Sequence, residues 1–142
     1  MSIATASATS TAPASAFFAR WSDCDTWPEW NTDTAWVRLD GPFTEGATGT
    51  LKPRGGPKVA FTVARLTANE FVDVSRMPGG RITFAHRIDE TADGTAISVT
   101  VDIEGALGWV WRRVLGKGLR SALQSDLDRL VAAAENDVAH AA

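Results

Sequence analysis

The sequence contains no tyrosine, one cysteine and only two histidines. The single cysteine, Cys24, cannot form a disulfide within the chain, which fits a reducing compartment. So few thiol and imidazole groups provide no metal-ligand spacing, and the chain has neither a phosphate-binding glycine motif nor a nucleophile elbow built around a serine. We therefore expect no metal site and no cofactor.

A long apolar run and a surplus of positive charge are also missing. No stretch approaches the roughly 20 apolar residues that a membrane-spanning helix needs. The first nineteen residues carry no charge, but they lack the basic and strongly apolar regions of a signal peptide. A net charge of −3 gives no advantage in binding phosphate backbones. The sequence thus predicts a cytoplasmic protein with no integral membrane segment and no nucleic-acid partner.

The composition is that of one globular domain. Apolar residues make up 44% and charged residues 22% of the 142 residues. A chain of this length buries roughly two thirds of its unfolded surface, which is enough for a core without disulfides. We predict a single domain over residues 1–142, in which residues 136–142 form a frayed tail.

Tryptophan is concentrated in one short region. Four of the six tryptophans are Trp21, Trp27, Trp30 and Trp36. Trp27 and Trp30 flank a proline, which stiffens the chain between the two large apolar rings. We predict that this corner closes one end of the fold and that Trp30 contacts a ligand cavity.

Turn-forming dipeptides divide the middle of the chain into short extended segments. The segments predicted as strands are 3–11, 35–39, 49–52, 59–66, 70–76, 81–89 and 95–104, and residues 14–22 are predicted as a short helix. The short links between the last six strands favour an antiparallel meander. Apolar side chains alternate along the final strands, so that Ile82, Phe84, His86 and Ile88 face one side.

Residues 107–135 are predicted to form a long helix with one apolar arc. The arc comprises Leu115, Leu119, Ala122, Leu123, Leu127, Leu130 and Ala134. It must lie against the apolar face of the sheet. We therefore predict an α+β fold in which a curved antiparallel sheet of about seven strands wraps around a long C-terminal helix, with two short helices after the first strand. One helix does not fill the concave side of such a sheet, so a cavity is expected there.

Several short strings, in this order, resemble a known family. They are Trp27-Pro28-Glu29-Trp30, residues 39–43 and 46–51, Gly55-Gly56-Pro57, residues 84–87 and 93–95, and the closing stretch 127–135. With them the chain resembles the START-like, or SRPBCC (Bet v 1-like helix-grip), superfamily, in its polyketide cyclase/dehydrase and lipid transport branch. The resemblance covers nearly the whole chain and implies the helix-grip fold. It does not fix an activity, because this superfamily includes carriers, cyclases, hormone receptors and chaperone activators.

The leading hypothesis is the binding or transport of a small hydrophobic molecule, such as a lipid, a polyketide or an aromatic metabolite. The residues predicted to line its internal cavity are Trp30, Phe61, Phe84, His86, Val99, Trp111, Leu115 and Leu119. Cyclases of this fold can use tyrosine to orient phenolic or enolic substrates. Because this chain has no tyrosine, we expect a binding protein rather than an enzyme. The protein is expected to be a monomer or a homodimer, since edge strands could pair between subunits.

The alternative hypothesis is a polyketide cyclase/dehydratase-like enzyme that uses His86 as an acid or base. A histidine on the inward side of its strand could transfer protons near neutral pH. Asp126 falls within the apolar arc of the helix, where a carboxylate needs a partner such as His86 or Arg65. His86 and Asp126 are therefore the candidate catalytic residues. For His86 the competing interpretation is a neutral histidine satisfied by a local hydrogen bond. For Asp126 it is a position at the edge of the arc that is more exposed to solvent than the helical wheel implies.

The segment 109–120 mixes aromatic and basic residues near the start of the long helix. Positive charge at a helix N-terminus opposes the helix dipole, so the local structure does not explain it. It could attract an anionic head group or membrane surface, or it could be a solvated face matched by acidic loops. An exposed apolar patch on this segment would favour a third hypothesis, a protein-partner module resembling the chaperone activators of the superfamily.

Overall fold

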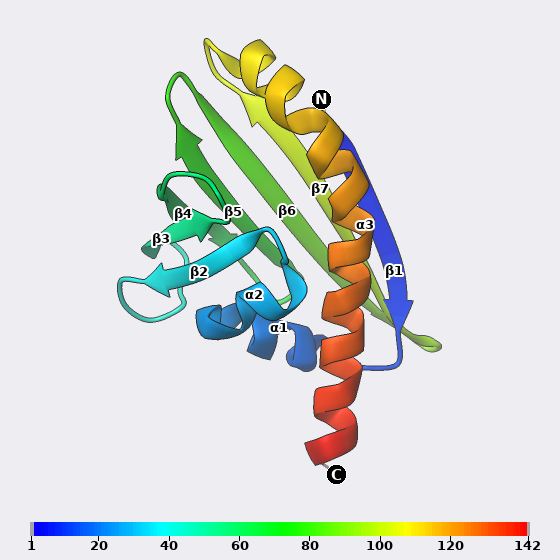
Figure 1. The fold of residues 1–142 in the computed structure, drawn as a ribbon. Coiled ribbons are helices and arrows are strands. Elements are labelled where there is room, and N and C mark those ends of the chain that lie inside the picture. Colours follow the sequence, from blue (N-terminus) through cyan, green and yellow to red (C-terminus); the bar gives the residue numbers. More distant parts are fainter. Residues whose placement is uncertain (1, 142) are drawn as a thin grey trace.

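A seven-stranded antiparallel sheet curves around one long helix in the computed structural model, which describes residues 2–141 (Figure 1). The strands are β1 (Ala4–Ser10), β2 (Thr34–Leu39), β3 (Thr48–Pro53), β4 (Val59–Leu66), β5 (Glu70–Met77), β6 (Gly80–Thr91) and β7 (Gly94–Glu104). The helical elements are α1 (Ala14–Ser22), the 3-10 turn η1 (Cys24–Thr26), α2 (Trp27–Trp30) and α3 (Gly108–Ala141). The strand order is β1-β7-β6-β5-β4-β3-β2. The predicted α+β helix-grip fold is confirmed.

The β5–β6 hairpin determines which side chains of β5 face α3. Its two-residue turn at residues 78–79 pairs Met77 with Gly80, and this register sets Asp73 opposite Phe84 and Phe71 opposite His86. Side chains of directly paired residues lie on the same face of a sheet. The apolar side chains of β6 face inward, so Phe71, Asp73 and Ser75 also face inward, whereas Val72 and Val74 face outward. The concave face of the sheet therefore carries polar groups.

Helices α1 and α2 cover the end of the concave face shown at the bottom of Figure 1. Trp21 and Trp27 are buried there, and their rings lie 5.3 and 6.0 Å from the ring of Phe71. The Trp27 indole also donates a hydrogen bond to the Trp21 carbonyl, at 3.0 Å. The tryptophan corner thus lies at one end of the fold, as predicted, and its rings are part of the core.

Helix α3 packs unevenly along its length. Its second half buries Leu123, Leu127 and Leu130, whereas in its first half Leu115 and Leu119 are only half-buried. The helix also extends beyond Glu135, so the prediction of a frayed tail is corrected for residues 136–141. The Arg20 guanidinium of α1 donates two hydrogen bonds to Asp137, at 2.7 and 2.8 Å, and thereby ties this last part to the body of the protein. Residue 142 lies outside the described residues.

Polar side chains of α3 satisfy the free edge of β1. The Gln124 amide donates to the Ser7 carbonyl at 3.0 Å and accepts from the Ser7 N–H at 3.4 Å. Arg120 donates to the Ile3 carbonyl, and Glu135 accepts from the Ser10 hydroxyl and the Thr11 N–H. An unsatisfied strand edge invites pairing with another chain, so these contacts block that edge. Within residues 2–141, no helix combines the length and hydrophobicity needed to cross a membrane.

Candidate functional site

Three buried polar side chains lie on the mostly apolar concave face: Asp73 and Ser75 of β5 and His86 of β6. They are only 5%, 6% and 7% exposed, respectively. Asp73 Oδ1 lies 3.9 Å from His86 Nδ1. The His86 ring stacks on Phe71 with a centroid separation of 4.9 Å and lies 5.1 Å from the ring of Trp21. The structure therefore holds a titratable pair within an aromatic cage formed by Phe71 and Trp21.

The hydrogen bonds of this pair define the histidine tautomer. His86 Nδ1 lies 2.9 Å from the carbonyl oxygen of Phe71, and since a carbonyl only accepts, Nδ1 carries the proton and Nε2 is an acceptor. Asp73 Oδ1 and the indole nitrogens of Trp21 and Trp30 are buried and have no hydrogen-bond partner among residues 2–141. Such groups are rare in folded proteins and indicate a place where a polar group from elsewhere can bind.

Burial makes the neutral forms of both residues dominant. Loss of hydration raises the pKa of Asp73 to about 7, although a backbone hydrogen bond opposes this shift. Loss of hydration lowers the pKa of His86 to about 4, against the opposing effect of its bond to Phe71. Between about pH 4 and pH 7 the site therefore presents a protonated carboxyl group as a donor and an imidazole Nε2 as an acceptor.

The pairing of Asp126 with His86, one of the alternatives considered, is not formed among residues 2–141. The Asp126 carboxylate instead accepts from Arg129 at 3.2 Å and from the Thr32 hydroxyl at 3.5 Å. Burial raises the pKa of Asp126, and the nearby Asp33 adds to this effect. Arg65, the other predicted partner, points to solvent because a bulge in β4 between Val63 and Arg65 shifts its register, and it pairs with Glu70.

Asp73, the residue that does accompany His86, is not among the residues predicted from the sequence. In the stretch 71–75 the two valines, Val72 and Val74, suggest that the even positions face the core. The structure has the opposite arrangement. The available signal was the two-residue turn at residues 78–79, from which the register can be counted back to Asp73.

The eight predicted cavity residues fall into two groups. Trp30, Phe61, His86 and Val99 are buried in the core. Phe84, Trp111, Leu115 and Leu119 are half-buried and pack at the edge of that core. The first group belongs to the core around the polar pair, and only the second group leaves part of its apolar surface uncovered.

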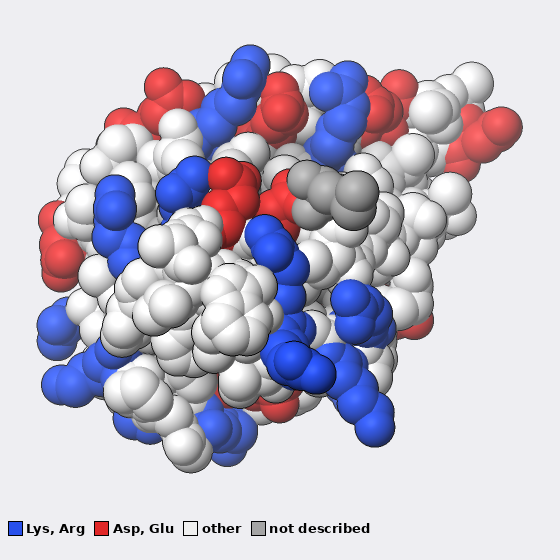
Figure 2. All heavy atoms as spheres, turned by 90° about the horizontal axis from the view of Figure 1, so that it is seen from above, with Lys and Arg blue, Asp and Glu red and all other residues white. Residues whose placement is uncertain are grey.

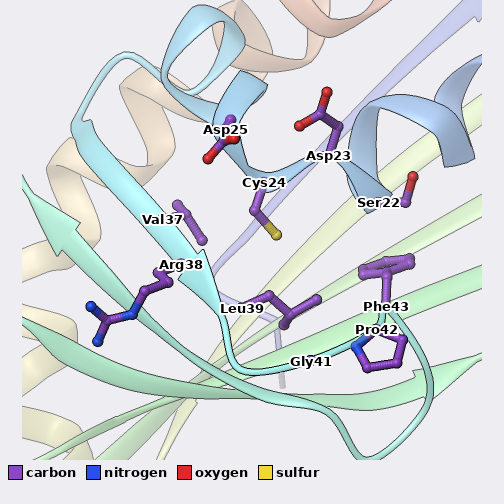
Figure 3. A pocket seen from close by; sticks show the side chains of 10 residues that line it. All are labelled: Ser22, Asp23, Cys24, Asp25, Val37, Arg38, Leu39, Gly41, Pro42 and Phe43. Atoms are coloured by element: carbon purple, nitrogen blue, oxygen red, sulfur yellow. The ribbon is translucent and has the colours of Figure 1, made fainter.

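A pocket of about 370 Å³ opens beside the aromatic cage (Figure 3). It is lined by residues 22–25, 37–39 and 41–43. The Cys24 side chain points into it toward Leu39 and Phe43, as Figure 3 shows. The Phe43 ring lies 5.2 Å from the ring of Phe71, which in turn stacks on His86, so this pocket borders the cage.

Neither nucleophilic nor metal chemistry finds support at this pocket. Burial and, to a lesser extent, the negative charges of Asp23 and Asp25 raise the pKa of the Cys24 thiol to about 11. A thiol that stays protonated is a poor nucleophile. In the part of the chain that the structure describes, no group of three or more His, Cys, Asp or Glu side chains is arranged to hold a metal ion.

Comparison with known proteins places the chain in a family. Residues 1–135 match the family described as polyketide cyclase / dehydrase and lipid transport. No curated protein matches the sequence.

Solved structures share the fold at low sequence identity. The di-domain ARO/CYC StfQ from the steffimycin biosynthetic pathway superposes with a TM-score of 0.73 at 14% identity, over 95% of this chain and 51% of StfQ, so this chain spans about half the length of StfQ. KanY superposes with a TM-score of 0.70 at 18% identity, over 93% of this chain and 96% of KanY. TTHA0849 from Thermus thermophilus superposes with a TM-score of 0.67 at 14% identity, over 92% of this chain and 95% of TTHA0849. Since the family match covers residues 1–135 of 142, the chain belongs to the polyketide cyclase/dehydrase and lipid transport family.

Proposed function

We propose that the protein binds a small hydrophobic molecule that carries a carbonyl or hydroxyl group, such as a polyketide, a lipid or an aromatic metabolite. The observation that carries this proposal is the buried Asp73–His86 pair on an apolar face, with Asp73 Oδ1 lacking a partner among residues 2–141. The apolar body of the ligand packs on Phe84, Leu115 and Leu119, and its polar group reaches the pair.

The protonation state of the pair indicates which polar group it recognises. A neutral Asp73 donates through its carboxyl proton, and His86 Nε2 accepts. A buried pair without net charge suits a neutral carbonyl or hydroxyl group and disfavours a charged one, because neither side chain offsets the loss of hydration of an ion. The family description and the polyketide pathway named for StfQ support a polyketide-like ligand.

A substitution that fills the apolar surface tests this proposal. Leu119→Trp adds an indole at a half-buried position of α3, whereas Ser121→Trp adds the same group at an exposed position one half-turn away. Binding of the neutral probe N-phenyl-1-naphthylamine is measured by fluorescence titration. We expect Leu119→Trp to weaken binding about tenfold or more, the value of a few lost apolar contacts, and Ser121→Trp to bind as the unsubstituted protein does. Equal affinity in both variants contradicts the proposed location, and absence of probe binding to the unsubstituted protein contradicts the proposed function.

A second candidate is a cyclase/dehydratase-like activity, and the presence of Asp73 beside His86 favours it. His86 Nε2 would remove a proton from a carbon between two carbonyl groups, while Asp73 gives its proton to a departing hydroxyl group, which leaves as water. The proton on His86 then returns to the Asp73 carboxylate, which restores the starting state. The low pKa of His86 restricts such a base to strongly acidic carbon acids.

The enzyme hypothesis is tested with a linear poly-β-keto thioester analogue. Product formation is followed by liquid chromatography and mass spectrometry for the unsubstituted protein, His86→Gln and Asp73→Asn. A loss of about 100-fold or more in rate in each variant, typical for removal of an acid or base, supports the hypothesis. Rates equal to the uncatalysed reaction in all three samples leave ligand binding as the function.

A further inference from the structure

The most exposed large apolar side chains of the described residues lie close together in the sequence. They are Leu107, Trp109 and Val114, with exposed fractions of 45%, 61% and 65%. The two other large apolar residues in this class, Trp36 and Val138, are less exposed at 38% and 40% and lie on other elements or at the far end of α3. Single exposed apolar residues are common, but a group of three at one end of a molecule indicates a surface that binds a partner.

Basic side chains accompany this group on the same face of α3. Val110, Arg113, Val114 and Lys117 are spaced three, four and seven residues apart, so they line one side of the helix, and Trp109 precedes Arg113 by four residues. Arg113 and Lys117 are exposed and form no ion pair with residues 2–141. We call Leu107, Trp109, Val110, Arg113, Val114 and Lys117 the α3-start surface.

The charge of this segment differs in sign from that of the whole protein. Residues 105–120 contain four basic side chains and no acidic one, in a chain with a net charge of −3. Looking down on the end of the molecule where α3 begins, Figure 2 shows an uncharged surface whose border carries mostly Lys and Arg side chains, together with some Asp and Glu side chains. Two of the four basic side chains, Arg112 and Arg120, donate hydrogen bonds to the backbone carbonyls of Ile103 and Ile3, whereas Arg113 and Lys117 make no such contact within residues 2–141.

The α3-start surface is fixed to the sheet and is not a loose helix end. The Leu107 N–H donates to the Gly79 carbonyl at 2.7 Å, and the Trp111 indole donates to the Pro78 carbonyl at 2.8 Å. The Leu107 side chain packs so closely on Gly79 that an added Cβ there would lie 2.6 Å from it. The apolar groups are therefore held in place before any partner binds.

We propose that the α3-start surface docks the protein onto an anionic lipid bilayer. Tryptophan prefers the level of the head groups, where its ring is partly apolar and its N–H is hydrated. Leu107 and Val114 enter the boundary of the acyl chains, and Arg113 and Lys117 meet the lipid phosphates, which is the arrangement of an interfacial amphipathic helix. The positive charge selects an anionic membrane over a neutral one.

Co-sedimentation with vesicles tests the proposal. Vesicles of phosphatidylcholine alone are compared with vesicles containing about 30% phosphatidylglycerol, at low and at physiological salt. We expect binding to the anionic vesicles that weakens as salt rises, since exposed charges are screened. Arg113→Gln/Lys117→Gln is expected to lower the partition coefficient about 25-fold, or roughly fivefold for each basic side chain near an anionic surface. Trp109→Ser/Val114→Ser is expected to lower it more than about tenfold, because the apolar contact is lost.

Matched variants elsewhere on the surface serve as controls. Trp36→Ser removes an exposed tryptophan from β2, and Arg38→Gln/Arg87→Gln removes two exposed basic residues from the sheet. Both controls should bind vesicles as the unsubstituted protein does. Absence of binding at low salt, or equal losses in the controls, overturns the proposal. So does dimerisation through this surface without vesicle binding, detected by analytical ultracentrifugation and lost in Trp109→Ser/Val114→Ser, since the occupant is then a second copy of the chain.

Discussion

Asp73 and His86 are expected to act in opposite directions on the pH dependence of stability, and substitution of one residue separates the two effects. The carboxyl pKa rises from 3.8 in the unfolded chain to about 7 in the folded one. The folded state therefore holds this proton more tightly, and its contribution to stability is lost as pH rises from about 4 to 7. At roughly 1.4 kcal/mol per pKa unit this loss is about 4 kcal/mol.

His86 contributes with the other sign. Its pKa falls from 6.5 in the unfolded chain to about 4 in the folded one. The unfolded chain then binds more protons between these values, so stability rises by about 3 kcal/mol as pH increases from about 4 to 6.5. In the unsubstituted protein the two changes of the free energy of unfolding with pH nearly cancel over this range. The reason is that the folded and the unfolded chain each hold one proton on the Asp73–His86 pair.

Substitution reveals each slope. In Asp73→Asn only the histidine slope remains, so the free energy of unfolding should rise by about 3 kcal/mol, relative to the unsubstituted protein, from about pH 4 to pH 6.5. In His86→Gln only the carboxyl slope remains, and the free energy should fall by about 4 kcal/mol from about pH 4 to pH 7. Only the change with pH is compared, since each substitution also alters hydrogen bonding by an amount that does not depend on pH.

Urea unfolding followed by circular dichroism, in small steps across the same pH range, provides the measurement. Asp89→Asn is the matched control, because the Asp89 side chain is 52% exposed. A plot of the free energy of unfolding against pH for this variant should run parallel to that of the unsubstituted protein. If Asp73→Asn also runs parallel, the carboxyl group is ionised throughout, and the neutral donor proposed at the ligand site does not exist.

The other predictions concern packing and the end of α3. Gly49→Ala should lower the free energy of unfolding by about 3 kcal/mol, the upper end of the range for overpacking, because the new methyl group would lie 2.7 Å from the Phe61 ring and would meet the rigid Arg38 carbonyl; urea unfolding measures this. A loss below about 1 kcal/mol would show that the Phe61 ring moves freely. Asp137→Asn should cost about 1 kcal/mol and should speed amide hydrogen exchange in residues 136–141, because it weakens the contact with Arg20; unchanged exchange there would show that helix packing alone holds the last turns.

The fold could be predicted because its local signals agree with its long-range contacts. Turn residues separate every strand of the meander, and neighbours in sequence are neighbours in the sheet. In β6 and β7 the apolar residues alternate, so Ile82, His86 and Ile97 were assigned to the correct face. The tryptophan corner was also assigned correctly to one end of the fold, because a proline between large rings permits few arrangements.

The candidate site could be predicted only in part, since its geometry depends on register. A single bulge in β4 turns Arg65 outward, and alternation within one strand gives no sign of such an insertion. In β5 the apolar Val72 and Val74 face outward while Asp73 faces inward, which inverts the usual pattern. Local hydrophobicity cannot reveal a carboxyl group that a hairpin turn places in the core. His86 was identified, but its partner required the pairing of two strands.

The end of α3 was mispredicted for a different reason. Beyond Glu135 the sequence offers few apolar residues, so it gives little reason for the helix to continue. The contact that retains residues 136–141 is made by Arg20, more than one hundred residues earlier, whose side chain is only 13% exposed and also binds Glu29. A tertiary contact of this range leaves no periodic mark in the sequence.

The hydrogen bonds from α3 to the edge of β1 have a consequence for synthesis on the ribosome. β1 is the first strand to be made, yet its only strand partner, β7, is the last, and Gln124 and Glu135, which cover its other edge, follow later still. The nascent β1 therefore lacks a strand partner until β7 has left the exit tunnel, and its other edge stays uncovered until Gln124 and Glu135 follow. We expect the β1–β7 pair to form only after β7 has left the exit tunnel, and nascent chains that stop before β7 to expose both edges of β1 to other nascent chains.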